Sequence, residues 1–176
     1  MNERTPRDPL LREAFEKANG PETPARPFVH LRVHSAYSLL EGALQLSKIV
    51  GHAVKDHAPA IAVTDTNNLF GALEFAQKAT KEGVQPLIGC QLDLEFSGEA
   101  SDQQRSARRS GMDLNPVVLF AANEEGYTNL VRLVSHAYLE GLPGEPVHVS
   151  SDLLSSRSGG LICLTGGPRG PIGSLL

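Results

Sequence analysis

Three side chains that could build a metal site or an ion pair alternate near the start of the chain: His30, Arg32 and His34. At this spacing they share one face if the segment is a strand. Two histidines on one face of a strand can bind a divalent metal ion when carboxylates from neighbouring loops complete the site. Glu41 and Asp65 are the candidate carboxylates. The alternative is that both histidines are structural, with ring nitrogens satisfied by hydrogen bonds.

The elements that must position these side chains alternate between strand and helix. Apolar runs predict strands at 28–33, 60–63, 84–96, 117–122 and 161–165. Apolar residues at helical spacing predict helices at 44–57, after the loop 64–68, and along the stripe of Tyr127, Leu130, Val131, Val134 and Tyr138. Strand and helix alternating about every 30 residues predict an α/β fold with parallel strands, either an open sheet or a barrel. Active sites of such folds lie at the carboxyl ends of the strands. The polar clusters at 34–38, at 65–68 and from 165 onward occupy those ends.

Two stretches interrupt this alternation. Residues 1–26 are predicted to form an N-terminal arm with four prolines, in which residues 11–18 allow one short amphipathic helix. Residues 97–116 are predicted to form a polar insertion loop within the domain at 27–176. The three arginines of this insertion, at 105, 108 and 109, are interpreted as solvated rather than as a DNA contact.

The composition describes a globular protein without a strong charge. Of 176 residues, 40% are apolar and 20% are charged, which is enough to bury a core. The net charge of −4 gives no general attraction to DNA or to anionic membranes. Cys90 and Cys163 have no paired spacing, which excludes a disulfide scaffold and a zinc ribbon and favours a reducing cytoplasm. Every apolar run is shorter than the roughly 18 residues of a membrane helix, and no signal peptide pattern is present.

Four runs, in order along the chain, resemble the motifs of the PHP (polymerase and histidinol phosphatase) domain. They are FVHLRVHSAYSLLEG at 28–42, AVTDTNNLFGA at 62–72, PLIGCQ at 86–91 and NEEGYTNL at 123–130. The resemblance covers about residues 27–173, and it is strongest to the PHP domains that begin the alpha subunits of bacterial DNA polymerase III. It implies an irregular β/α barrel with a metal cluster at the carboxyl ends of the strands.

The sequence departs from metal-binding members of this family in three motifs. Those members carry a His-x-His pair, a Thr-Asp-His and a Gly-Cys-Glu. Here Arg32 replaces the first His of the pair, Thr66 replaces the His after Asp65, and Gln91 replaces the Glu after Cys90. The resemblance therefore defines six former metal-cluster positions: Arg32, His34, Glu41, Asp65, Thr66 and Gln91.

We expect these replacements to abolish metal binding and leave no catalytic residue or cofactor in this chain. A guanidinium cannot ligate a cation. At about 4 Å from a divalent ion and an effective dielectric near 20, it adds roughly 8 kcal/mol of repulsion. We predict that Arg32 instead replaces the metal as a fixed cation and forms an ion pair with Asp65 or Glu41. The alternative is that Arg32 points into solvent at the barrel mouth.

Two weaker patterns are interpreted structurally. Residues 91–96 resemble short peptides that bind the bacterial sliding clamp, but their alternation predicts a core strand. The glycines at 166, 167, 170 and 173 match no phosphate-binding loop and are interpreted as a connector.

About five β/α units do not close a PHP barrel, so we expect the N-terminal part of a PHP domain from a longer polymerase subunit, folding poorly alone. The resemblance implies a scaffold in DNA replication that docks the proofreading epsilon exonuclease. The other expected partner is the rest of the alpha subunit, with DNA reached only through the holoenzyme. Mg²⁺ is expected only for the polymerase part of that nucleotidyltransferase. The alternatives are a metal-dependent PHP phosphoesterase or 3′–5′ exonuclease, and a stand-alone PHP-like binding protein.

Overall fold

The computed structural model describes residues 28–96, 114–141 and 144–176. The predicted arm at 1–26, with its amphipathic helix, and most of the predicted insertion at 97–116 lie outside these residues. No helix in the described ranges is both long and apolar enough to cross a membrane.

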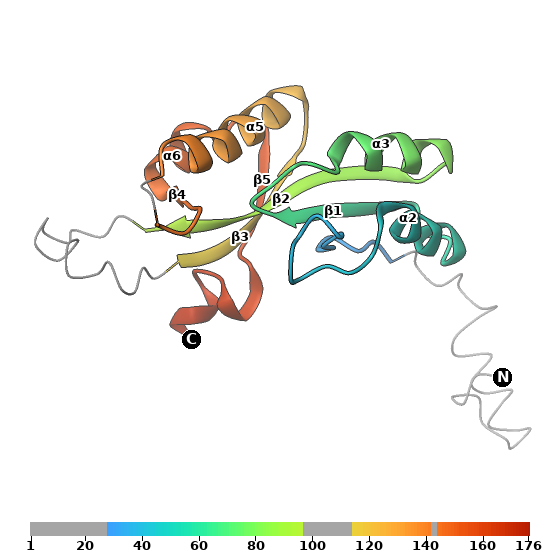
Figure 1. Ribbon diagram of the computed structural model, residues 1–176, viewed down its shortest axis with the longest axis horizontal. Coiled ribbons are helices and arrows are strands. Elements are labelled where there is room, and N and C mark those ends of the chain that lie inside the picture. Colours follow the sequence, from blue (N-terminus) through green and yellow to red (C-terminus); the bar gives the residue numbers. More distant parts are fainter. Residues whose placement is uncertain (1–27, 97–113, 142–143) are drawn as a thin grey trace, which may run out of the picture.

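A five-stranded sheet forms the centre of the molecule (Figure 1). Its strands are β1 Ala60–Thr66, β2 Gln85–Glu95, β3 Leu114–Ala121, β4 Val149–Ser150 and β5 Leu161–Leu164. The strand order is β1-β2-β3-β5, and the short β4 pairs with the end of β2. Among the strands that the structure describes, none joins β5 back to β1. The expectation of an α/β fold with an unclosed barrel is therefore confirmed.

The prediction that all strands run parallel is wrong for β3. The β2 strand pairs in parallel with β1 and β4, whereas β3 runs antiparallel to both β2 and β5. A parallel pair needs a long crossover connection, usually a helix. The sequence between β2 and β3 carries no helical apolar repeat. The β3 strand is therefore the one reversed strand of the described sheet, and it begins at Leu114 rather than at residue 117.

Residues 28–33, predicted as the first strand, lie along β1 without forming a regular strand. The Ala62 amide donates to the His30 carbonyl at 3.0 Å, and the Thr64 amide donates to the Val33 carbonyl at 2.8 Å. The Val33 amide donates to the Thr64 hydroxyl at 3.0 Å. Because a side chain takes the place of a backbone acceptor there, the ladder is interrupted although the segment still borders β1.

The three long helices occur where the apolar spacing predicts them. They are α2 Leu46–Lys55, α3 Ala72–Lys81 and α5 Glu124–Leu139. Figure 1 shows α3 and α5 lying along one side of the sheet. The α6 helix Ser151–Ser156, the strand β4 and the 3₁₀ turns η2 Gly167–Arg169 and η3 Gly173–Leu175 are not predicted by the periodicity. These elements have six residues or fewer, which is too short for a period to be visible.

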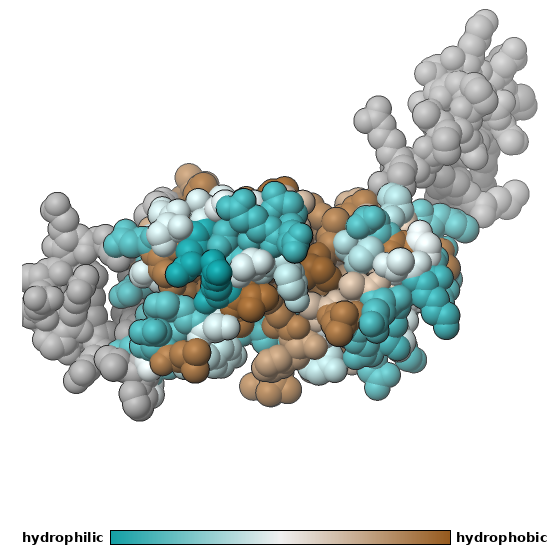
Figure 2. Space-filling view, turned by 90° about the horizontal axis from the view of Figure 1, so that it is seen from above, coloured by the Kyte–Doolittle hydropathy of each residue, from teal (hydrophilic) through white to brown (hydrophobic). Residues whose placement is uncertain are grey.

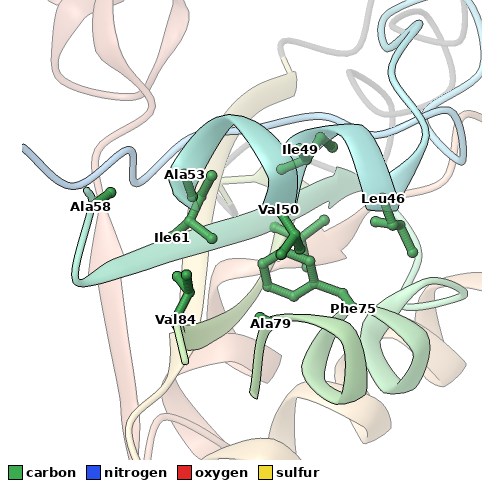
Figure 3. Packing of buried hydrophobic residues seen from close by; sticks show 10 residues of the cluster. Leu46, Ile49, Val50, Ala53, Ala58, Ile61, Phe75, Ala79 and Val84 are labelled. Carbon is green, nitrogen blue, oxygen red and sulfur yellow. The ribbon is translucent and has the colours of Figure 1, made fainter. Parts of the chain in front are cut away.

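Two apolar clusters fix the helices against the sheet. The first joins α2, α3 and the inner side of β1, with Val50, Ile61 and Phe75 at its centre (Figure 3). The second joins α5 to β2 and β3 through Leu92, Leu119 and other fully buried residues. Each fully buried side chain of this size contributes about 1.5–3 kcal/mol.

The buried face of α5 coincides only in part with the predicted stripe, in which Leu130 is buried and Val134 packs against the core. Gly126, Asn129, Leu130, Leu133 and Ala137 are buried, whereas Tyr127, Val131 and Tyr138 are exposed. A Cβ on Gly126 would lie 1.8 Å from the Gly160 carbonyl oxygen, so the helix approaches the turn before β5 along its glycine side. Figure 2, viewed from above Figure 1, shows apolar side chains reaching the surface.

Candidate functional site

The former metal-cluster positions meet where β1 and β2 run side by side. Thr66 on β1 pairs in register with Gln91 on β2, so their side chains emerge on the same face of the sheet. Gln91 is buried, and its side-chain amide donates to the Thr66 hydroxyl at 3.4 Å. The structure therefore brings these two positions into contact.

Arg32 binds Gln91 and the loop that follows β5. Its Nε and Nη2 atoms donate to the Gln91 Oε1 atom at 3.1 and 2.6 Å, and its Nη1 atom donates to the Gly166 carbonyl at 3.1 Å. One guanidinium thus connects the segment before β1, the strand β2 and the glycine-rich loop. Hydrogen bonds from a charged donor are stronger than neutral ones.

The predicted ion pair of Arg32 with Asp65 or Glu41 is replaced by these contacts. Both carboxylates already have other partners, and within the described residues neither forms a salt bridge with Arg32. The alternative, an arginine pointing into solvent, holds in part: Arg32 is exposed, but each of its three guanidinium nitrogens donates to a protein acceptor. The register of β1 and β2 explains why Gln91, and not Asp65, is the partner of Arg32. Gln91 pairs with Thr66, and Asp65, one residue earlier on β1, points to the opposite face of the sheet.

Asp65 is the centre of a buried network that the sequence did not predict. The carboxylate accepts from the Ser35 amide at 2.6 Å, the Ser35 hydroxyl at 2.7 Å and the Ser38 hydroxyl at 2.6 Å. The Ser38 hydroxyl accepts in turn from the Thr66 amide at 3.0 Å. Asp65 is 3% exposed, so this carboxylate holds the turn after Arg32 against the end of β1.

His34 and Glu41 form a second small network. The Glu41 Oε2 atom lies 3.0 Å from the His34 Nδ1 atom and accepts from the Thr66 hydroxyl at 2.5 Å. The Nε2 atom of His34 is buried and has no hydrogen-bond partner within the described part of the chain. The interpretation of His34 as a structural histidine therefore holds for only one of its ring nitrogens, Nδ1, which has a partner.

Two ionisable groups on β2 are perturbed by burial. Burial raises the pKa of the Cys90 thiol to about 12, which leaves this thiol protonated and unreactive near neutral pH. Burial also raises the pKa of Asp93, helped by the nearby Glu41 charge and opposed by a hydrogen bond from Asn67 and by Arg169 and His148.

The donor set does not fit the metal cluster that the family implies. Arg32 contributes a permanent cation, and Thr66 and Gln91 contribute neutral groups that are already hydrogen-bonded. Both oxygens of Asp65 are occupied by three donors. No three histidine, cysteine or carboxylate side chains within the described ranges lie close enough together to share an ion.

Sequence reasoning missed Ser35, Ser38 and Gly166 as partners in this site. Ser35 and Ser38 directly follow His34 in the first motif, and hydroxyls three residues apart in a turn could have indicated a shared acceptor. Gly166 was interpreted as part of a connector, and a backbone carbonyl leaves no signal in a sequence.

Comparison with known proteins matches residues 30–176 to the PHP domain family. The DNA polymerase III subunit alpha of Treponema pallidum is 41% identical over 149 residues, which is 85% of this chain and 12% of that protein. The subunit of Caulobacter vibrioides is 45% identical over 150 residues, which is 84% of this chain and 12% of that protein. The chain thus spans about an eighth of these relatives.

A solved amidohydrolase from Chromobacterium violaceum is 20% identical, with a TM-score of 0.41 over 61% of this chain and 34% of that one. The family match covers every former metal-cluster position as well as the sheet and helices around them. This chain belongs to the PHP domain family.

Proposed function

We propose that this chain is the PHP region of a DNA polymerase III alpha subunit and acts as a structural part of the bacterial replication machinery in the cytoplasm. Identities of 41% and 45% to regions of two such subunits support this assignment. The expected partners are the rest of the alpha subunit and the proofreading epsilon exonuclease. DNA is then contacted through the holoenzyme, and Mg²⁺ belongs to the polymerase part of the subunit.

The observation that carries the structural role is the position of the Arg32 guanidinium. It donates to Gln91 and to Gly166, so it links three segments at a place where metal-binding relatives are expected to hold ions. A guanidinium stays charged at every physiological pH and needs no cofactor to do this. We therefore propose a degenerate site in which a permanent side-chain cation replaces the metal as the link between strand ends.

A hydrolase assay tests the non-catalytic part of this proposal. The purified chain is assayed for phosphatase and 3′–5′ exonuclease activity with added Zn²⁺ or Mn²⁺. We expect no hydrolysis above buffer. The matched variant Arg32→His/Thr66→His/Gln91→Glu restores the three replaced ligand types and is expected to gain zinc binding. Metal-dependent hydrolysis by the unmodified chain, abolished by Asp65→Ala, would overturn the proposal.

A chimera tests the assignment to the replicative subunit. The matching region of the Caulobacter vibrioides alpha subunit is replaced by this chain, and primer extension and retention of the epsilon subunit are measured. We expect both to persist. Loss of both in a folded chimera would instead favour a stand-alone PHP-like protein.

A further inference from the structure

The strand β4 and the helix α6 form a short segment that is attached to the end of β2. The backbone attachment is small, because only Leu94 and Glu95 of β2 pair with β4, through Val149 and Ser150. Figure 1 shows β4 lying beside this end of β2, away from α2 and α3. Segments held by few backbone hydrogen bonds open locally at a lower free energy than the core does. A single side-chain contact across this junction therefore affects how firmly the segment is held.

Apolar packing seats the segment independently of pH. Val149 is 1% exposed within the second apolar cluster, and Val147 and Leu153 pack partly buried against the same cluster. The side-chain amide of Asn67 donates to the Val147 carbonyl at a long 3.5 Å. None of these groups titrates near neutral pH, so a response of the segment to pH has to come from the ionisable groups at the junction.

His148 presents each of its ring nitrogens to an oxygen that accepts hydrogen bonds. Its Nδ1 atom lies 2.8 Å from the Pro146 carbonyl oxygen, and its Nε2 atom lies 3.7 Å from the Glu95 Oε2 atom. Because a carbonyl oxygen cannot donate, the proton of the first contact is on Nδ1. In the neutral ring Nε2 is then an acceptor that faces a carboxylate. In the imidazolium Nε2 also carries a proton, and the ring forms an ion pair with Glu95.

The charged groups around His148 on β2 are negative. Asp93 lies on the same face of β2 as Glu95, and its charge interacts with that of His148. Glu41 and Arg169 act on Asp93 from neighbouring segments, with opposite signs. The helices α5 and α6 also pack against β4. Within the described ranges, the following charged or titratable side chains of these two helices form no ion pair with His148: Glu124, Glu125, Arg132, His136 and Asp152.

The pair of His148 and Glu95 is shielded from water on the histidine side. The two side chains are 16% and 43% exposed. A partly shielded pair is screened less by salt and water than a pair of fully exposed charges. Loss of the Nε2 proton removes the attraction and leaves two acceptors facing each other across the junction of β2 and β4.

We propose that His148 is a pH-sensitive link in the fold, which holds β4 and α6 on the end of β2 while its ring is doubly protonated and loosens them when the Nε2 proton is lost. The attraction to Glu95 is present at mildly acidic pH, where the imidazolium and the carboxylate are both charged. It disappears as the pH rises through the range in which histidine side chains titrate, about pH 5 to 8. This inference does not depend on the role in replication, because it rests on contacts within this chain.

Hydrogen exchange of the 176-residue chain, measured by mass spectrometry at about pH 6 and about pH 8, tests this inference. Each exchange rate is divided by the intrinsic rate of an unstructured peptide at the same pH, which gives a protection factor. We expect the protection of residues 149–156, taken relative to that of α3, to be about threefold lower at the higher pH.

Two substitutions remove the two partners of the link. His148→Gln cannot gain a proton, so the relative protection of residues 149–156 should be the same at both pH values. Glu95→Gln keeps the size of the side chain but removes its charge, and should abolish most of the difference. The matched control His52→Gln changes an exposed histidine of α2 and should retain the difference. Asp93→Asn should also retain it, because Glu95 is still present.

Circular dichroism of each variant checks the fold. The inference fails if the unmodified chain shows no difference between the two pH values in residues 149–156. It also fails if folded His148→Gln or folded Glu95→Gln retains the full difference. Loss of the difference in Asp93→Asn but not in Glu95→Gln would assign the response to Asp93 and overturn the inference.

Discussion

The networks around Asp65 and Arg32 lie close to the same strand ends but are built differently. Asp65 is buried and takes all its donors from one turn, through Ser35 and Ser38. Arg32 lies nearer the surface and binds two segments that are far apart in the sequence, through Gln91 and Gly166. The difference teaches that Asp65 is a local anchor, whereas Arg32 connects segments that are far apart in the sequence.

Removal of the Asp65 carboxylate should have the largest effect on stability of the substitutions in the two networks. Asp65→Ala leaves three buried donors on Ser35 and Ser38 without an acceptor. Each unsatisfied buried donor costs about 1–3 kcal/mol, so we expect the free energy of unfolding to fall by about 4 kcal/mol. Urea denaturation measures this loss, with the exposed Asp56→Ala as control. A loss as small as that of the control would show that the network does not hold the turn.

Removal of Arg32 should cost less, because this side chain is partly solvated. Arg32→Ala is expected to lower the free energy of unfolding by about 1–2 kcal/mol, since three hydrogen bonds from a charged donor are lost. Arg32→Lys keeps the positive charge but not the planar set of guanidinium donors. It should therefore be more stable than Arg32→Ala but less stable than the unmodified chain. Thermal melts compare both with the exposed Lys48→Ala. An unchanged melting temperature in Arg32→Ala would contradict the role of Arg32 as a link.

Substitution of Asp93 should have the smallest effect on the free energy of unfolding, and this effect should depend on pH. Burial raises the folded pKa of Asp93 above its ordinary, unfolded value, so its contribution to stability is present below the unfolded pKa and is lost as pH rises through the folded pKa. Asp93→Asn should therefore raise the free energy of unfolding at pH 7, by less than about 1 kcal/mol because the group is only partly buried.

The difference between Asp93→Asn and the unmodified chain should shrink near pH 3, where both side chains are neutral. Urea denaturation at the two pH values measures it, with Asp56→Asn as the exposed control. Equal effects of Asp93→Asn at pH 7 and pH 3 would contradict the raised pKa.

Much of the fold could be predicted because local patterns determine it. The strands β1, β2 and β5 and the helices α2, α3 and α5 follow apolar runs and helical spacing that a single sequence displays. The direction of β3 could not be predicted from its own residues, because strand polarity depends on the connection. The close approach of Gly126 on α5 to Gly160 could not be predicted either, because only the tertiary structure shows it.

The sequence could name the residues of the candidate site but not their contacts. The motif resemblance placed Arg32, Thr66 and Gln91 together, and the structure brings their side chains into one network. Opposite charge alone suggested Asp65 as the partner of Arg32. In the structure Asp65 instead accepts hydrogen bonds from the hydroxyls of two serines. Neighbouring hydroxyls can satisfy a buried carboxylate without any cation.

Metal content is the most direct test of whether a side-chain cation has replaced the metal. The chain is purified without chelators, and zinc, manganese and iron are measured by mass spectrometry, followed by a thermal melt with and without EDTA. We predict no stoichiometric metal and the same melting temperature in both melts. One or more equivalents of metal, lost in a folded His34→Ala variant and accompanied by a lower melting temperature in EDTA, would contradict the account.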